Sequence, residues 1–205
     1  MRNLRATTMY EFTDNVIRHL NKEYIGIFSR LKKKSLAKMD EVTLLGEVRG
    51  TYSQLVKITK PMLLEVANWS YHNFSNKGSL PMSWLTAFLD SYSPVTKYVF
   101  SREVDRKQSR LYEALVATNG SPAEIDAALR HWSKMIAEYA VEVTDAALLE
   151  ALEDNDVDSV EWFTEEDERV CSECGKRHGK IYPIDNIPPK PHWGCRCYYI
   201  PSKTG

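Results

Sequence analysis

The sequence has no cysteine before position 171, although it is 205 residues long and contains four cysteines in all. It has no uncharged apolar run near the ~20 residues that span a bilayer, and its start lacks the apolar stretch of a secretory signal. No internal repeat or low-complexity tract is apparent. We therefore expect a soluble chain that is made in the cytoplasm.

The composition is that of a folded protein. Apolar residues make up 43% of the chain and aromatic residues 11%, which is enough to bury a core. The length suits one domain or two small ones.

Charge is distributed unevenly along the chain. Residues 1–60 carry 12 basic and 6 acidic side chains, whereas residues 141–205 carry 7 and 14. Residues 150–168 include ten carboxylates and no Lys or Arg. This acidic run is either a solvated face or linker, or a surface that repels nucleic acid or attracts a basic partner.

Apolar residues spaced three or four apart predict long helices over the first three quarters of the chain. Ser121 and Glu124 have capping-box spacing and predict a helix start there, running to about Leu152 or breaking near "VEVT". The other expected elements are a helix from Thr7 or Thr8 to Lys32, a helix over 44–58 that Pro61 interrupts or kinks, a loop over 75–81, and a helix from Ser93 to near Asn119.

After Asp154 the pattern changes to short aromatic and β-branched runs between turn residues. "VEWF", "KIYPI" and "CYYIP" predict three small strands. The expected fold is mainly α, with a helical body over 1–154 and a small β-rich cysteine module over 155–205, an α+β arrangement.

The four cysteines have the spacing of a metal site. Cys171 and Cys174 form Cys-x2-Cys, and Cys195 and Cys197 form Cys-x-Cys, with His192 three residues before Cys195. A tight turn would direct the first pair inward, with Gly175 free to take a left-handed conformation after it. An extended strand would place the side chains of the second pair on one side, so that both pairs could face one ion. Structural Zn2+ held by the four cysteines is favoured, with His192 as competing ligand or supporting group. Disulfides and free thiols remain alternatives.

Catalysis is not indicated by this pattern. Four cysteines would close a tetrahedral site, whereas a zinc hydrolase or nuclease needs an open position, so we expect no enzyme and no small-molecule substrate. Lys32, Lys33 and Lys34 lie near aromatic residues and form a weak candidate for phosphate contact. A nucleic-acid-binding zinc module acting in regulation is the alternative function.

The C-terminal region resembles the phage head morphogenesis family, the minor capsid proteins similar to protein F of phage Mu. The resemblance covers about residues 138–201, with His followed by Cys-Arg-Cys as its most specific part. Trp193 stands where the family usually has proline. The matching residues are Trp162, Asp167, Arg169, Cys171, Cys174, Gly179, Pro188, Pro189, His192, Cys195, Arg196 and Cys197.

The resemblance implies a low-copy structural protein inside the phage head. Such a protein is associated with the portal vertex and assists procapsid assembly, DNA packaging or DNA delivery. The expected partner is the portal protein, and scaffolding or major capsid protein and double-stranded DNA are further candidates. No membrane is expected as a partner. The expected location is the capsid interior of the virion, after assembly in the host cytoplasm.

Overall fold

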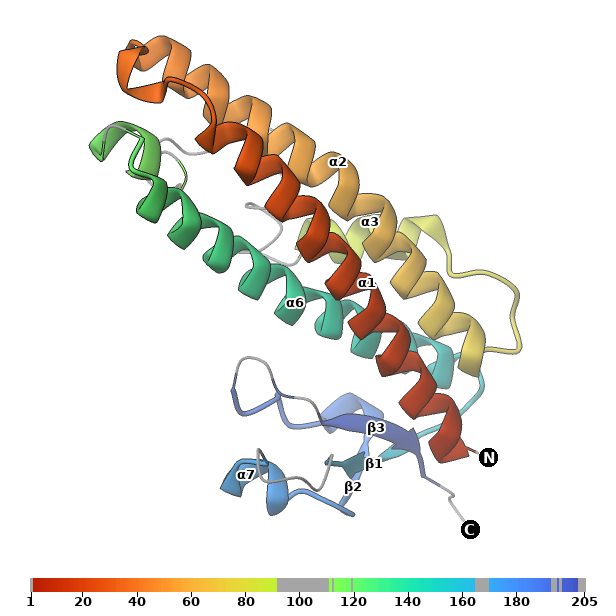
Figure 1. Cartoon of the computed structure of the whole chain (residues 1–205). Coiled ribbons are helices and arrows are strands. Elements are labelled where there is room, and N and C mark those ends of the chain that lie inside the picture. The colour runs from red at the N-terminus through yellow and green to blue at the C-terminus, as the bar shows by residue number, and fades with distance from the viewer. Residues whose placement is uncertain are drawn as a thin grey trace. The chain divides into compact units, whose positions relative to one another are not determined.

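The computed structural model describes residues 2–91, 111, 113–118, 120–164, 170–192, 195 and 197–202. Within these ranges the chain is mainly helical and has one small antiparallel sheet near its C-terminal end (Figure 1). The predicted class, a helical chain with a β-rich C-terminal part, is confirmed. None of the helices in the described ranges is long and apolar enough to cross a membrane.

Three long helices dominate the chain: α1 (Arg2–Lys32), α2 (Glu41–Phe74) and α6 (Pro122–Glu153). The start predicted at Thr7 or Thr8 is too late, because Arg, Leu and Ala in the preceding residues favour helix. Of the two outcomes predicted at Pro61, an interruption is wrong, since α2 continues through it, and a kink stays a prediction. Leu55 and Leu63 are buried on either side, so packing of this face outweighs the backbone hydrogen bond that proline cannot make.

Within the described residues, the loops and helix starts lie where the turn and capping residues of the sequence predict them. The predicted loop 75–81 separates α2 from α3 (Met82–Ser91). The predicted helix from Ser93 lies largely outside the described residues, which here include a short π-helical turn, η2 (Glu113–Ala117). Helix α6 begins directly after Ser121, as the capping-box spacing predicts, and runs unbroken through "VEVT".

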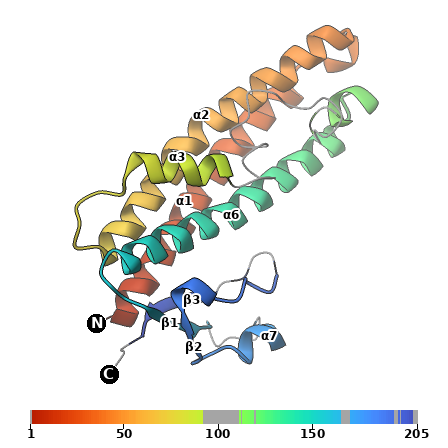
Figure 2. The same cartoon turned by 180° about the vertical axis from the view of Figure 1, so that it is seen from behind.

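The chain forms two compact units. One of them, unit 2, consists of Asn15–Leu64 and Met82–Ala137. In it the long helices run side by side (Figures 1 and 2). Tyr24 of α1 hydrogen-bonds Thr59 of α2 at 2.6 Å and meets the edge of Trp132 from α6 with ring centroids 6.0 Å apart.

Unit 1 consists of Met1–Asp14, Glu65–Pro81 and Glu138–Gly205. It holds the sheet, in the order β2-β1-β3 and antiparallel throughout. The strands are β1 (Ser159–Phe163), β2 (Ile181–Pro183) and β3 (Tyr198–Pro201). The division of the chain at residue 154 stays a prediction.

The core of unit 1 joins the sheet to helix residues. Trp162 on β1 is fully buried and lies opposite Tyr199 of β3, with ring centroids 5.3 Å apart. Met9 of α1 and Leu148 of α6 belong to the same buried cluster. Three of the four cysteines belong to it as well, so the predicted ligands are part of the core of this unit.

A candidate metal centre

The first cysteine pair lies on a single helical turn, α7 (Ser172–Gly175). Cys171 is its N-cap, and its Sγ accepts a hydrogen bond from the backbone N–H of Cys174 at 3.3 Å. The N–H of Gly175 donates to the carbonyl of Cys171 at 2.9 Å. These bonds place both thiols on one compact turn, because a sulfur at an N-cap satisfies a free N–H of the first turn much as a hydroxyl does.

The left-handed glycine of this turn is Gly179, not Gly175 as predicted. Gly175 is the last residue of α7, whereas Gly179 has a φ of +73°. Its N–H donates to the carbonyl of Trp162 at 2.8 Å. The chain can therefore reverse there and return beside β1 as β2, because glycine has no Cβ to oppose a positive φ.

The second cysteine pair precedes β3. Cys195 and Cys197 are both buried, and their alternate spacing gives them the same neighbour, Cys174. Strand β3 pairs with β1 on the edge opposite to β2, with Phe163 facing Tyr198. The central strand thus brings together two cysteine pairs that twenty residues separate in the sequence.

The sulfur atoms and one imidazole converge in two overlapping groups. Cys174, Cys195 and Cys197 form one group, and Cys171, Cys174 and His192 form the other. Within each group the ligand atoms lie within 4.8 Å of one another. The Sγ of Cys174 is 3.5 Å from that of Cys195 and 3.7 Å from Nε2 of His192.

These spacings fit the donor arrangement of a zinc ion. Sulfur ligands at about 2.3 Å from a tetrahedral zinc lie about 3.8 Å from one another. The two distances from Cys174 are close to that edge length. The soft sulfur donors with one imidazole nitrogen are the set that zinc prefers, so the residues present fit the ion.

Cys174 is shared by the two groups, and Cys171 and His192 are both placed to complete a set of four ligands. In the described part of the chain, no four of these donors lie within 4.8 Å of one another. Cys174, Cys195 and Cys197 are buried, Cys171 is partly exposed and His192 is exposed. The buried three therefore form the inner part of the cluster, with Cys171 and His192 at its solvent side.

The thiols influence one another's ionisation. Hydrogen bonding with Cys197 lowers the pKa of the Cys195 thiol to about 5, whereas burial raises the pKa of Cys174 to about 12. The hydrogen bond with Cys195 raises the pKa of Cys197, and hydrogen bonds with Cys174 lower that of Cys171. The hydrogen bond between Cys195 and Cys197 thus favours the thiolate at Cys195 and the protonated thiol at Cys197, because a donor to the charged form lowers the pKa of the acceptor. All four cysteines are free of disulfides.

His178 supports the turn beside the cluster. Its Nδ1 accepts a hydrogen bond from the backbone N–H of Thr164 at 3.2 Å, and its ring lies 5.0 Å from that of Phe163. The sequence showed only that His178 lies within the cysteine module. The contact with Thr164 follows from strand pairing, which the residue spacing does not report.

The predicted lysine cluster lies at the end of α1, in unit 2. Lys32 pairs with Asp126 at 2.6 Å and Lys34 pairs with Glu47, while Lys33 is exposed. The charges of Lys32 and Lys34 are thus partly balanced by carboxylates. Their role in nucleic-acid contact stays a prediction.

Part of the acidic run lines an open groove in unit 1. Glu153, Asp156 and Asp158 lie around it together with Asp185, and its volume is about 730 Å³. The groove concentrates negative charge at the end of α6 and beside β2.

One comparison with known proteins gave a match. The family model described as "Phage Mu protein F like protein" matches residues 104–200, just under half of the chain. The matched stretch contains all four cysteines and His192. No curated protein and no solved structure matches the chain significantly.

Proposed function

We propose, since residues 104–200 of this chain belong to the phage Mu protein F-like family, that the protein is a minor structural component of a phage head. The family suggests a structural role in phage head morphogenesis, which agrees with the resemblance found in the C-terminal sequence. More specifically, the protein acts at the portal vertex and assists procapsid assembly, DNA packaging or DNA delivery.

The observation that carries this proposal is the family match across the cysteine cluster. The matched residues include both cysteine pairs, the three strands up to Ile200 and most of the core of unit 1. The feature that resembles the family in sequence is therefore also the feature around which this unit is built.

The cluster holds one structural zinc ion in this proposal. The sheet has only three short strands, and such a module buries little apolar surface of its own. A zinc ion bound by thiolates adds folding free energy directly. Cys174, Cys195 and Cys197 hold it, and Cys171 or His192 completes the tetrahedron.

The role of the ion is structural and the protein is not an enzyme in this proposal. A tetrahedral zinc ion that has four protein ligands leaves no position for a water nucleophile or a substrate. The module then serves as a rigid end, and the long helices provide surfaces for partner proteins such as the portal.

The head role is tested by mass spectrometry of DNA-filled particles purified from an induced culture of the source organism. Particles are treated with external protease before analysis, and disrupted particles treated in the same way serve as the control. We expect peptides of this chain to survive only in intact particles, at low abundance relative to the main shell protein.

Two results would count against the head role. Peptides that are digested in intact particles would place the protein outside the capsid. Absence from particles, with the protein free in the lysate, would favour the regulatory nucleic-acid-binding zinc module instead.

A further inference from the structure

Lys190 lies between Pro189 and Pro191, two residues before His192. Its Nζ is 2.5 Å from Oδ2 of Asp145 on α6. The two side chains are only 14% and 12% exposed, so the ion pair is largely removed from water. The ion pair holds the segment around Lys190 against α6, at a residue 45 positions earlier in the sequence.

Aromatic rings surround the same ammonium group. Nζ of Lys190 lies 5.5 Å from the ring centroid of Tyr10 on α1 and 5.5 Å from that of Tyr199 on β3. The hydroxyl of Tyr10 donates to the other carboxylate oxygen of Asp145. Three elements, α1, α6 and β3, thus meet at one side chain, where cation–π attraction adds to the ion pair.

The backbone of the preceding residue, Pro189, is also held by a hydrogen bond. Nη1 of Arg177 donates to the carbonyl of Pro189 at 2.7 Å, and the Arg177 guanidinium lies 4.9 Å from the ring centroid of Trp162. The backbone at Pro189 and the side chain at Lys190 are therefore both held. Pro191 follows with a fixed φ, which limits the freedom of the chain just before His192.

Buried ion pairs are a costly way to stabilise a fold. The desolvation of two charges often cancels their attraction, and apolar residues of similar volume commonly do as well. In some proteins a buried polar or charged group sets one arrangement among several. In this unit the arrangement that matters is the approach of His192 Nε2 to within 3.7 Å of Cys174 Sγ.

We propose that Lys190 is a positioning residue: its contacts with Asp145, Tyr10 and Tyr199 hold the Pro-Lys-Pro segment so that His192 reaches Cys174 and serves as a metal ligand. Metal affinity of the cluster then depends on residues of α1 and α6 that lie outside the cysteine module. This inference rests on the metal site proposed above and not on the role in the head.

The test is a double-mutant cycle on the full-length protein with Co2+ as the probe. Co2+ bound to thiolates in tetrahedral geometry gives absorption bands whose intensity and position report the ligand set. Asp145→Asn with Lys190→Met removes both charges, while Asn keeps an oxygen acceptor for the Tyr10 hydroxyl. His192→Ala is made in the wild-type protein and in this double variant.

We expect the Asp145→Asn, Lys190→Met variant to weaken Co2+ binding 10- to 100-fold, the range found when supporting groups of metal sites are lost. His192→Ala alone, which removes the proposed ligand itself, should weaken binding at least as much. The double variant should show the same change in the absorption bands as His192→Ala. Adding His192→Ala to the double variant should then weaken binding less than about 3-fold further, because the imidazole no longer reaches the ion.

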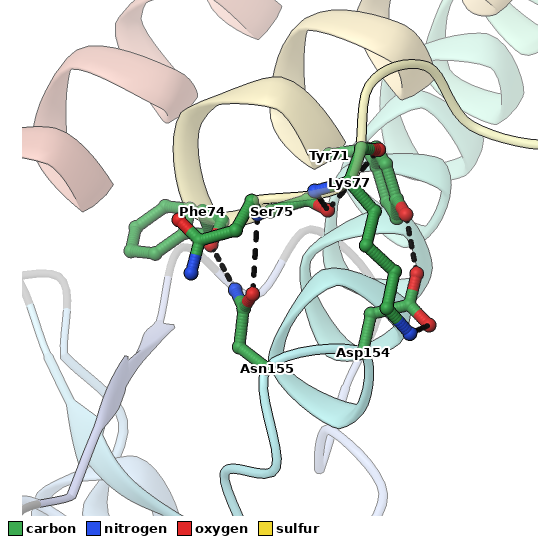
Figure 3. A network of polar contacts seen from close by, with 7 residues as sticks. Tyr71, Phe74, Ser75, Lys77, Asp154 and Asn155 are labelled. Atoms are coloured by element: carbon green, nitrogen blue, oxygen red, sulfur yellow. Dashed lines mark hydrogen bonds and ion pairs between the residues drawn. The ribbon is translucent and has the colours of Figure 1, made fainter.

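Unit 1 contains a matched control with the same residue types (Figure 3). Tyr71 donates to Asp154, and Lys77 pairs with Asp154 at 2.8 Å, but Lys77 is 64% exposed. Tyr71 lies on α2, Lys77 in the loop after it and Asp154 directly after α6, so none of them belongs to the segment that carries His192. Asp154→Asn with Lys77→Met should leave Co2+ affinity unchanged.

Three outcomes overturn the proposal. The first is an unchanged Co2+ affinity in the Asp145→Asn, Lys190→Met variant, and the second is a loss for His192→Ala that is the same in both backgrounds. If that variant fails to fold, Lys190→Arg is tested in its place, because arginine keeps the positive charge but changes the position of the charged group. An unchanged Co2+ affinity in Lys190→Arg is the third outcome. Wild-type protein that binds no Co2+ would overturn the metal site as a whole, a result distinct from absence of the protein from particles.

Discussion

The Sγ atoms of Cys174 and Cys195 lie 3.5 Å apart, although 21 positions separate the two residues in the sequence. The contact exists because β1 is the central strand, with β2 on one edge and β3 on the other. The turn carrying Cys174 lies before β2 and Cys195 lies before β3, so pairing of both strands with β1 brings the two thiols together. Two sulfurs at this separation are spaced as ligands of one ion rather than as a disulfide, whose S–S bond is about 2.05 Å.

Replacing Cys174 should damage metal binding more than replacing Cys171. Cys174 belongs to both groups of donors, whereas Cys171 belongs to one and His192 can take its place. We expect Cys174→Ser to bind less than one zinc per chain and Cys171→Ser to retain zinc with weaker affinity. Elemental analysis and a Co2+ titration of both variants measure this. A Cys174→Ser protein that still holds one zinc tightly would refute the assignment.

Chelation should unfold the sheet of unit 1. Structural zinc contributes apparent binding free energies of about 10–16 kcal/mol in small zinc modules, and this energy is lost with the ion. We expect a strong chelator to abolish the near-ultraviolet circular dichroism of the packed rings around Trp162, and zinc to restore it. The same thermal melt before and after complete metal removal would contradict a structural role.

The helices of unit 2 should lose stability at alkaline pH through Tyr24. Burial raises the pKa of Tyr24 from its usual value of 10 to about 12. A raised pKa means that its contribution is fully present below pH 10 and is lost as the pH rises toward 12. By pH 11 the loss is about 1 kcal/mol. Urea unfolding at pH 8 and pH 11 should therefore show a smaller alkaline decrease for Tyr24→Phe than for the wild type.

The control for this prediction lies in the same measurement. Tyr24→Phe removes the hydrogen bond to Thr59 and should cost about 1 kcal/mol at pH 8, where no tyrosine ionises. Parallel stability profiles of the two proteins between pH 8 and pH 11 would show that Tyr24 does not have a raised pKa.

Two glycines of unit 2 should respond to alanine with opposite signs. Gly120 has a φ of +75°, and a Cβ there would lie 2.7 Å from Cβ of Leu36. Left-handed backbone and overpacking together should make Gly120→Ala less stable by about 2 to 4 kcal/mol. Gly50 lies within α2 with nothing within 4 Å of the added methyl, so Gly50→Ala should stabilise by about 0.5 to 1 kcal/mol.

Chemical unfolding of the two alanine variants measures both effects. Equal changes in the free energy of unfolding of the two variants would mean that neither the left-handed conformation at Gly120 nor its close approach to Leu36 makes alanine unfavourable there.

Much of the local structure follows from the sequence. Val16, Leu20 and Tyr24, which are spaced four residues apart in the first helix that the sequence predicts, are all buried. The capping-box signal at Ser121 marks the start of α6. The errors occurred where local rules compete with packing. Pro61 is a helix breaker by its backbone, yet the buried faces on either side keep α2 continuous.

The candidate site was predicted in part. The two cysteine spacings predicted which residues converge in the cluster, because short turns and extended pairs each place two sulfurs together. They did not show that Cys174 is shared by both donor groups, nor that the left-handed turn uses Gly179 instead of Gly175. Both depend on where the chain reverses beside β1, a long-range pairing that residue spacing does not encode.

The sequence by itself determined the helical class, the three short strands, the cysteine spacing on which the cluster depends, and the resemblance of the C-terminal region to the phage Mu protein F-like family. Each rests on residue type and local spacing, which periodicity and motifs report directly. Only the tertiary structure decided that Lys190 meets Asp145 and two tyrosines from distant elements. A contact between residues 10, 145, 190 and 199 exists only after α1, α6 and β3 have packed, because loop closure and burial, not spacing along the chain, bring these side chains together.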